Sequence, residues 1–93
     1  MRIAILILAA VLVGCETVPR PTCAKLAGRH YRMLRAQGIP AEIVVCKMAD
    51  GELHAVVKTQ GVYHDPAFDL LRRRLPGQYR FTVRRPELWP EFN

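Results

Sequence analysis

The sequence predicts a small α+β domain in which one N-terminal helix packs on a small antiparallel β-meander. Three observations lead to this prediction. Apolar residues recur at helical spacing over residues 24–34, and the β-rich runs 41–48 and 53–60 flank Asp50-Gly51, a strong hairpin signal. A further β-rich run covers residues 78–85. A single helix can cover only one face of such a sheet.

Residues 1–14 have the composition of a secretory signal peptide. A lone Arg2 precedes an apolar run that is too short to cross a membrane stably, and small residues follow it. The stretch Leu12-Val13-Gly14-Cys15 resembles a bacterial lipoprotein box, which implies cleavage before Cys15 and a diacylglycerol on its thiol. Several acyl chains hold a protein on a membrane without spanning it. The alternative is an ordinary signal peptide in which a cysteine merely follows Gly14.

The lipoprotein resemblance also implies a location and a partner. In lipoproteins of the enterobacterial type, an Asp after the lipidated cysteine retains the protein on the inner membrane, and Glu16 stands there in this chain. We therefore expect a bacterial cell-envelope protein, held on the periplasmic face of the outer membrane by the lipid on Cys15. Residues 15–21 then form the lipidated tether and residues 22–93 the domain. Cleavage of 14 of the 93 residues leaves 79.

The charge of the chain is basic and unevenly distributed. Lys and Arg number 14 against 8 Asp and Glu, which gives a formal net charge of +6. Export to the envelope argues against a nucleic-acid partner. Six arginines of the C-terminal part have no acidic residue between them: Arg72, Arg73, Arg74, Arg80, Arg84 and Arg85. An ordinary solvated face is one interpretation, and a surface that contacts anionic lipid or cell-wall polymer is the other.

Residues 21–38 carry the start and stop signals of the predicted helix. Thr22 is a suitable N-cap, which places Cys23 on the first turn, and Gly38 with the Ile-Pro pair after it ends the helix. His30 and Tyr31 are expected to be packing or boundary residues. A cysteine on a first turn lies near backbone N–H groups and the positive end of the helix dipole, which favour a thiolate. Cys23 is therefore a candidate nucleophile.

The last part of the chain is predicted to alternate between turn and strand. Residues 67–77 form a helical turn or a loop, and residues 78–85 form a strand. Residues 86–92 form a terminal turn that packs Trp89 and Phe92.

The first hairpin relates Cys46 to His54. If Asp50-Gly51 is a two-residue turn, Lys47 lies opposite His54. Cys46 then lies opposite Ala55 and points away from the face that carries His54.

The second hairpin relates His54 to Asp65. Gln60-Gly61 predicts a tight turn, after which residues 62–66 form a short strand that is interrupted by its final proline. If this turn has two residues, Val56 lies opposite Asp65. Asp65 then shares a face with His54 at the diagonal position, where Cβ atoms are about 7 Å apart or less.

The order of Cys23, His54 and Asp65 resembles that of bacterial transglutaminase-like cysteine peptidases, relatives of the papain-like fold. The likeness spans residues 22–66, and the Gly-Glu-Leu-His-Ala-Val-Val stretch is its most specific part. It implies a minimal core of this fold, with Cys23 as nucleophile, His54 as base and Asp65 as the carboxylate that orients the imidazole, and no cofactor. The implied substrate is an amide or acyl bond in a peptide, a protein or peptidoglycan near the membrane. Hydrolysis and transfer to an amine both remain open.

The chain departs from this family's pattern beside the cysteine. The segment between Cys15 and Cys23 holds no match for the upstream residue that helps to form the oxyanion hole in relatives, and Thr22 and Ala24 replace their acidic residues. The backbone N–H of Cys23 is the one donor that the sequence offers. These departures favour a second hypothesis, a non-catalytic envelope lipoprotein that uses the same fold as a binding or structural module.

Other interpretations of the cysteines and histidines stay open. A Cys23–Cys46 disulfide is natural for a small exported domain. The predicted register turns Cys46 away from the face of His54, but a bulge or a longer turn would reverse the face of Cys46. A zinc site made of Cys23, Cys46, His54 and His64 has suitable ligand types but no closely spaced ligand pair.

Overall fold

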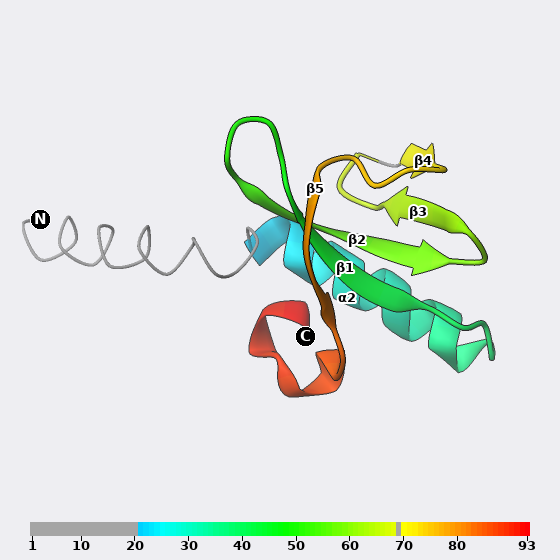
Figure 1. Cartoon of the computed structure of the whole chain (residues 1–93). Helices are drawn as coiled ribbons and strands as arrows, with labels where there is room; N and C mark the ends of the chain where they lie inside the picture. Colours follow the sequence, from blue (N-terminus) through cyan, green and yellow to red (C-terminus); the bar gives the residue numbers. More distant parts are fainter. Residues whose placement is uncertain (1–20, 69) are drawn as a thin grey trace, which may run out of the picture.

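The computed structural model describes residues 21–68 and 70–93, which form one long helix and a five-stranded antiparallel sheet (Figure 1). The elements are α2 (Pro21–Ala36), β1 (Glu42–Lys47), β2 (Leu53–Thr59), β3 (Val62–Asp65), β4 (Leu70–Arg72), β5 (Gln78–Val83) and the 3-10 turns η1 (Pro86–Leu88) and η2 (Pro90–Phe92). The predicted α+β class is confirmed. The signal peptide, the lipidation site Cys15 and most of the tether lie outside the described residues. Within those residues, no helix is long and apolar enough to cross a bilayer.

The first turn of α2 carries Cys23, as predicted. Pro21 is the first helical residue, a position where its missing N–H is not needed and its fixed φ suits the helix. Thr22 lies inside the helix, so the prediction that Thr22 is the N-cap is wrong. The helix begins earlier because proline is itself favoured at the first helical position.

Gly38 ends α2 in the predicted way. Its φ of +76° lies in the left-handed region that glycine adopts without strain. The Gly38 N–H donates to the carbonyl oxygen of Arg35 (3.0 Å), and the Ile39 N–H donates to that of Leu34 (2.9 Å). These two bonds form a Schellman motif, which satisfies the last carbonyl groups of the helix and directs the chain toward β1.

The register of the β1–β2 hairpin differs from the prediction by one residue. Cys46 lies opposite His54, and Val45 lies opposite Ala55. Cys46 and His54 are therefore on the same face of the sheet, and the prediction that they point to opposite faces is wrong. A shift of one residue reverses the face of every side chain in a strand.

The turn between these strands explains the shift. The Met48 N–H donates to the carbonyl oxygen of Glu52 (2.8 Å), and the Gly51 N–H donates to that of Met48 (2.9 Å). Gly51 has a φ of +87°. Residues 49–51 thus form a three-residue loop that ends in a left-handed glycine, the alternative to the two-residue turn for an Asp-Gly pair.

The β2–β3 hairpin has the predicted register. Gln60 and Gly61 have positive φ values of 51° and 82°, as a tight two-residue turn requires. Thr59 lies opposite Val62, and Val57 lies opposite His64. Asp65 is the next residue of β3 and therefore points to the face that carries His54.

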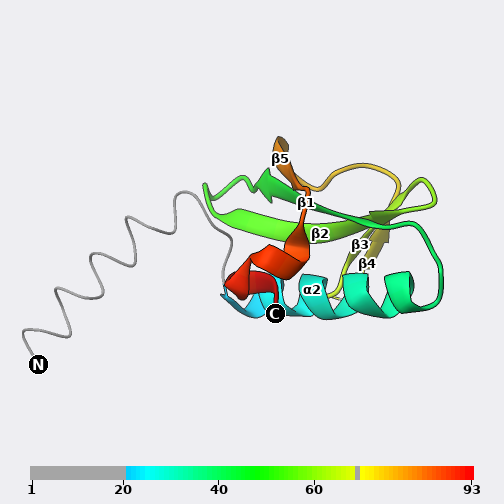
Figure 2. The same cartoon turned by 90° about the horizontal axis from the view of Figure 1, so that it is seen from below.

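The C-terminal half of the chain departs from a simple meander. Leu70–Arg72, predicted as part of a helical turn or loop, form β4 and pair with β3. The chain then crosses the whole sheet, so that the predicted strand β5 pairs with β1 and the order is β4-β3-β2-β1-β5. The crossing segment and α2 lie on opposite sides of the sheet (Figure 2).

The apolar core lies between α2, one set of alternating sheet positions and the C-terminal turns. Its buried members are Ala24, Ala27, Ile43, Val45, Leu53, Ala55, Val57, Val83 and Phe92. His54 and Asp65 belong to the other set of alternating positions. The candidate site is therefore separate from the main core.

The C-terminal turns pack closely on α2 at Gly28. A Cβ atom at Gly28 would lie 1.8 Å from the carbonyl oxygen of Phe92. Phe92 is fully buried, and Arg32 Nη1 donates a hydrogen bond to its carbonyl oxygen (2.6 Å). The ring of Trp89 stacks on that of Phe81 at a centroid distance of 5.9 Å. The predicted terminal turn that packs Trp89 and Phe92 is confirmed.

Replacing Gly28 by Ala should destabilise the protein. Helix propensity alone favours Ala over Gly by about 1 kcal/mol. The clash with Phe92 instead displaces the C-terminal turns, and we expect the free energy of unfolding to fall by roughly 2–4 kcal/mol, as for the loss of a buried aromatic contact. Urea unfolding followed by the fluorescence of Trp89, the single tryptophan, measures this change.

Lys25→Ala is the matched control, because Lys25 is an exposed residue of the same helix. Its effect should stay within about 0.5 kcal/mol. A more stable Gly28→Ala variant would contradict the close approach of the C-terminal turns to α2.

Candidate active site

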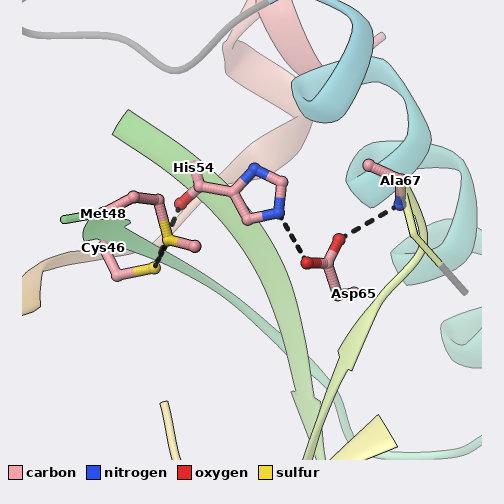
Figure 3. A network of polar contacts seen from close by, with 5 residues as sticks. All are labelled: Cys46, Met48, His54, Asp65 and Ala67. Atoms are coloured by element: carbon pink, nitrogen blue, oxygen red, sulfur yellow. Dashed lines mark hydrogen bonds and ion pairs between the residues drawn. The ribbon is translucent and has the colours of Figure 1, made fainter. Parts of the chain in front are cut away.

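The side chains of Cys23, His54 and Asp65 come together at one end of the sheet. Cys23 comes from the first turn of α2, His54 from the beginning of β2 and Asp65 from the end of β3. His54 Nε2 and Asp65 Oδ2 are 2.7 Å apart (Figure 3). All three residues are buried.

The difference in length between β2 and β3 gives access to His54. In the β2–β3 register Asp65 is level with Val56, so β2 extends beyond β3 at Leu53–Ala55. The space beside this extension is bordered by Cys23 and by the turn that contains Ala67 and Phe68. The imidazole points from β2 toward Asp65 across this end of the sheet (Figure 3). The start of α2 can therefore reach the ring without passing through the sheet.

Asp65 fixes both the imidazole and the turn that follows β3. Its Oδ2 accepts the hydrogen bond from His54, and its Oδ1 accepts one from the Ala67 N–H (3.2 Å). The Phe68 N–H donates to the carbonyl oxygen of Asp65 (3.3 Å). Asp65 thus has the ordinary turn-forming role of an Asp before a proline and also contacts His54.

The hydrogen bond between the side chains of Cys23 and His54 raises the pKa of the imidazole. This contact is the largest influence on the pKa of His54; burial acts in the opposite direction, and the hydrogen bond and charge of Asp65 raise the pKa further. A carboxylate only accepts hydrogen bonds, so Nε2 carries the hydrogen that lies toward Asp65. Nδ1 is then the ring nitrogen that remains for Cys23.

Cys46 lies on the face of His54 but has a different environment. Its thiol donates to the carbonyl oxygen of His54 (3.7 Å) and contacts Met48 Sδ (3.9 Å) (Figure 3). Burial, followed by the charge of Asp65, raises the pKa of Cys46 to about 11. No disulfide joins Cys23 to Cys46 in this structure, so that alternative is not realised.

A cavity of about 370 Å³ opens beside the thiol and the imidazole. Its walls come from the start of α2, the β1–β2 loop, the start of β2 and the turn after β3: Thr22, Cys23, Met48, Asp50, Glu52, Leu53, His54, Ala67 and Phe68. The sequence pattern did not predict the wall residues of the loop and of the turn. Their position depends on the short length of β3, which Pro66 indicated, and on the three-residue form of the loop, which Asp50-Gly51 alone does not specify.

The other histidines form a separate contact. The rings of His30 on α2 and His64 on β3 are 4.1 Å apart, and burial, followed by the charge of His64, lowers the pKa of His30. Tyr31 packs against the core and donates a hydrogen bond to Glu87 (3.3 Å). His30 and Tyr31 are both partly buried, so the prediction that they are packing or boundary residues is confirmed. In the described part of the chain, no three side chains of metal-ligating type are grouped to hold an ion.

No protein family matches the chain, and no curated protein or solved structure is significantly similar to it. The chemistry proposed for the site therefore rests on its own residues.

Replacing Asp65 by Asn should lower the pKa of His54, because the hydrogen bond and the charge of Asp65 both raise it. The folded pKa lies above the ordinary value of 6.5, so protonated His54 stabilises the fold fully below that value. This contribution is lost as the pH rises through the folded pKa. Asp65→Asn should therefore cost more stability at about pH 5 than at about pH 9.

An NMR titration of the His54 ring protons and urea unfolding at both pH values test this prediction. Glu42→Gln, which removes an exposed carboxylate from β1, is the control and should leave the His54 titration unchanged. An unchanged His54 pKa in Asp65→Asn, or a larger loss of stability at the alkaline pH, would show that the pair does not act as described.

Proposed function

We propose that this protein is a membrane-tethered thiol hydrolase or acyl transferase of the bacterial envelope, similar to the transglutaminase-like cysteine peptidases. Cys23 is the nucleophile, His54 the general base and acid, and Asp65 the orienting carboxylate. The observation that carries the proposal is the position of the His54 imidazole, which contacts the thiol of Cys23 and the carboxylate of Asp65. The lipid on Cys15 serves as the membrane anchor.

The environment of His54 favours a thiolate–imidazolium pair in the resting enzyme. The raised pKa of His54 means that the ring holds a proton more strongly than an ordinary histidine does. Cys23 is the third residue of α2, where backbone N–H groups and the helix dipole stabilise negative charge. Transfer of the thiol proton to Nδ1 therefore produces two charges that are both stabilised locally.

The reaction begins when Cys23 Sγ attacks the carbonyl carbon of an amide. A C–S bond forms, and the carbonyl oxygen takes up negative charge. The first-turn N–H groups of a helix point out of its N-terminal end, so the Cys23 N–H is the donor that we assign to this oxygen. His54 then gives its proton to the amide nitrogen as the C–N bond breaks, which releases an amine and leaves a thioester.

A second attack completes the cycle. Water or an amine attacks the thioester carbon, and His54 accepts the proton of the attacking group. The C–S bond breaks, the thiolate returns to Cys23, and the product is a carboxylic acid or a new amide. Asp65 keeps the same hydrogen bond to Nε2 in both half-reactions and so holds the ring with Nδ1 toward the sulfur.

A non-catalytic envelope module is the second candidate function. Only 4% of Cys23 and 7% of His54 is exposed, which restricts the approach of a large substrate to the thiol. The six arginines of the C-terminal part are all exposed and provide a basic contact surface for such a module. In this alternative the His54–Asp65 pair has a structural role only.

Alkylation of the thiols by iodoacetamide distinguishes the two functions. We expect Cys23 in the full chain to react at pH values below neutrality, because the thiolate is the nucleophile. His54→Ala should slow the reaction of Cys23 by roughly tenfold or more, because the pair no longer stabilises the thiolate. Mass spectrometry of the labelled peptides reports Cys23 and Cys46 separately.

Two internal comparisons control for loss of folding. Cys46 should react slowly in every folded variant, since its pKa is raised to about 11 and it is buried. His64→Ala removes a histidine adjacent to Asp65 and should leave the rate of Cys23 within about twofold. A slow rate at Cys23 that does not depend on His54, or isolation of Cys23 in a disulfide, would refute the catalytic function.

A further inference from the structure

The cavity beside Cys23 has an acidic wall although the chain is basic. Asp50 and Glu52 both line it, and no Lys or Arg among the described residues does. The chain as a whole carries a formal net charge of +6. The charged side chains that the described residues contribute to this wall are therefore opposite in sign to the net charge of the protein.

The loop that carries the two acids has a defined shape. The Glu52 N–H donates to Asp50 Oδ1 (3.0 Å), and Gly51 adopts the left-handed conformation that closes the turn. Glu52 precedes His54 by two residues, and β2 begins between them. The backbone of the loop and the Asp50 carboxylate thus have a defined position near the reacting groups, and Asp50 and Glu52 are both exposed.

The remaining wall of the cavity is apolar. Leu53 lies at the start of β2, Met48 lies at the start of the loop, and Phe68 comes from the turn after β3. Phe68 is 65% exposed, and the centroid of its ring is 5.7 Å from that of His54. An exposed aromatic ring that lines the same cavity as two carboxylates can contact the stem and the charge of a cationic side chain.

We propose that this cavity selects substrates with a flexible cationic side chain, of the lysine or arginine type, next to the amide that Cys23 attacks. This inference rests on the proposed function, since it assigns the substrate of the same site. The methylene stem lies against Phe68 and Leu53, and the ammonium or guanidinium group lies near Asp50 and Glu52. Anionic side chains are repelled by the same two carboxylates.

Charged thiol reagents measure this selectivity at Cys23. The probes are two methanethiosulfonates, one with a trimethylammonium group and one with a sulfonate group; the Cys23 thiolate forms an S–S bond and a sulfinate leaves. The measured quantity is the rate with the cationic reagent divided by the rate with the anionic reagent at Cys23. The same ratio for 2-mercaptoethanol corrects for the charge of the thiolate itself. In the full chain we expect Cys23 to favour the cationic reagent by at least roughly threefold more than the free thiol does.

Isosteric variants assign the preference to the acidic wall. Glu52→Gln and Asp50→Asn should each reduce the ratio, and the double variant should bring it to that of the free thiol. Asparagine keeps an oxygen that can accept the Glu52 N–H, so the loop retains its shape. Glu42→Gln removes one negative charge outside this cavity and should leave the ratio unchanged.

A binding measurement tests the inference without any reaction. In Cys23→Ser, NMR shifts of Phe68 and His54 report the binding of acetyl-lysine methylamide and of acetyl-norleucine methylamide, which lacks the ammonium group. We expect the lysine derivative to bind at least roughly fivefold more tightly, and Glu52→Gln to remove this difference. Equal affinities for the two derivatives would overturn the inference.

The outcomes separate this inference from the proposed function. If the alkylation of Cys23 depends on His54 but neither assay shows a preference for cations, the catalytic function is supported and the assigned substrate class is wrong. If Cys23 is unreactive while the lysine derivative still binds in a Glu52-dependent way, the catalytic function is wrong and the cavity is a cation-binding site.

Discussion

The hydrogen bond between His54 Nε2 and Asp65 Oδ2 is the interaction on which the candidate site depends. It joins two neighbouring strands at the point where β3 ends and β2 continues, and both residues are buried. A buried ionisable group is costly unless it is paired and hydrogen-bonded, so each of these side chains stabilises the other in its buried position. The same carboxylate accepts the Ala67 N–H, which holds the turn that forms one wall of the cavity. The orientation of the ring and the position of one wall of the cavity therefore depend on Asp65.

The domain supports this polar pair with apolar packing elsewhere. The core uses small helix residues, Ala24 and Ala27, so that α2 lies close to the sheet, and Gly28 allows the C-terminal turns to approach it. Phe92 completes the core from a segment that lies near the other end of the chain. A domain of this size buries a smaller share of its surface than a large one, so each close contact contributes a large part of its stability. The main core and the site occupy alternating positions of the same strands, which keeps the polar residues out of the apolar cluster.

The sequence predicted those features of the fold that depend on local chemistry. Gly38 and Gln60-Gly61 act as expected because a left-handed residue at a helix end or in a two-residue turn has few alternatives. Asp50-Gly51 suits both a two-residue turn and a three-residue loop, so the sequence pattern did not fix the register of β1 against β2. β4 was missed because three exposed residues carry no alternating pattern. The crossing of β5 to the edge of β1 was missed because strand order depends on contacts between distant segments.

The site could be predicted more completely than the hairpin beside it, and the topology explains why. The relation of His54 to Asp65 depends only on the β2–β3 turn, which has one strongly preferred form for Gln60-Gly61. The relation of Cys46 to His54 depends on the β1–β2 loop, where the predicted register was wrong. The corrected register brings Cys46 to the face of His54, yet its thiol contacts the His54 backbone and Met48 rather than the imidazole, and burial raises its pKa. The two buried cysteines therefore differ in the surroundings of the sulfur. Cys23 lies on the first turn of a helix and contacts an imidazole, whereas burial of Cys46 opposes the ionisation of its thiol. A position on the same sheet face as His54 is therefore not sufficient to give Cys46 the surroundings that favour a thiolate.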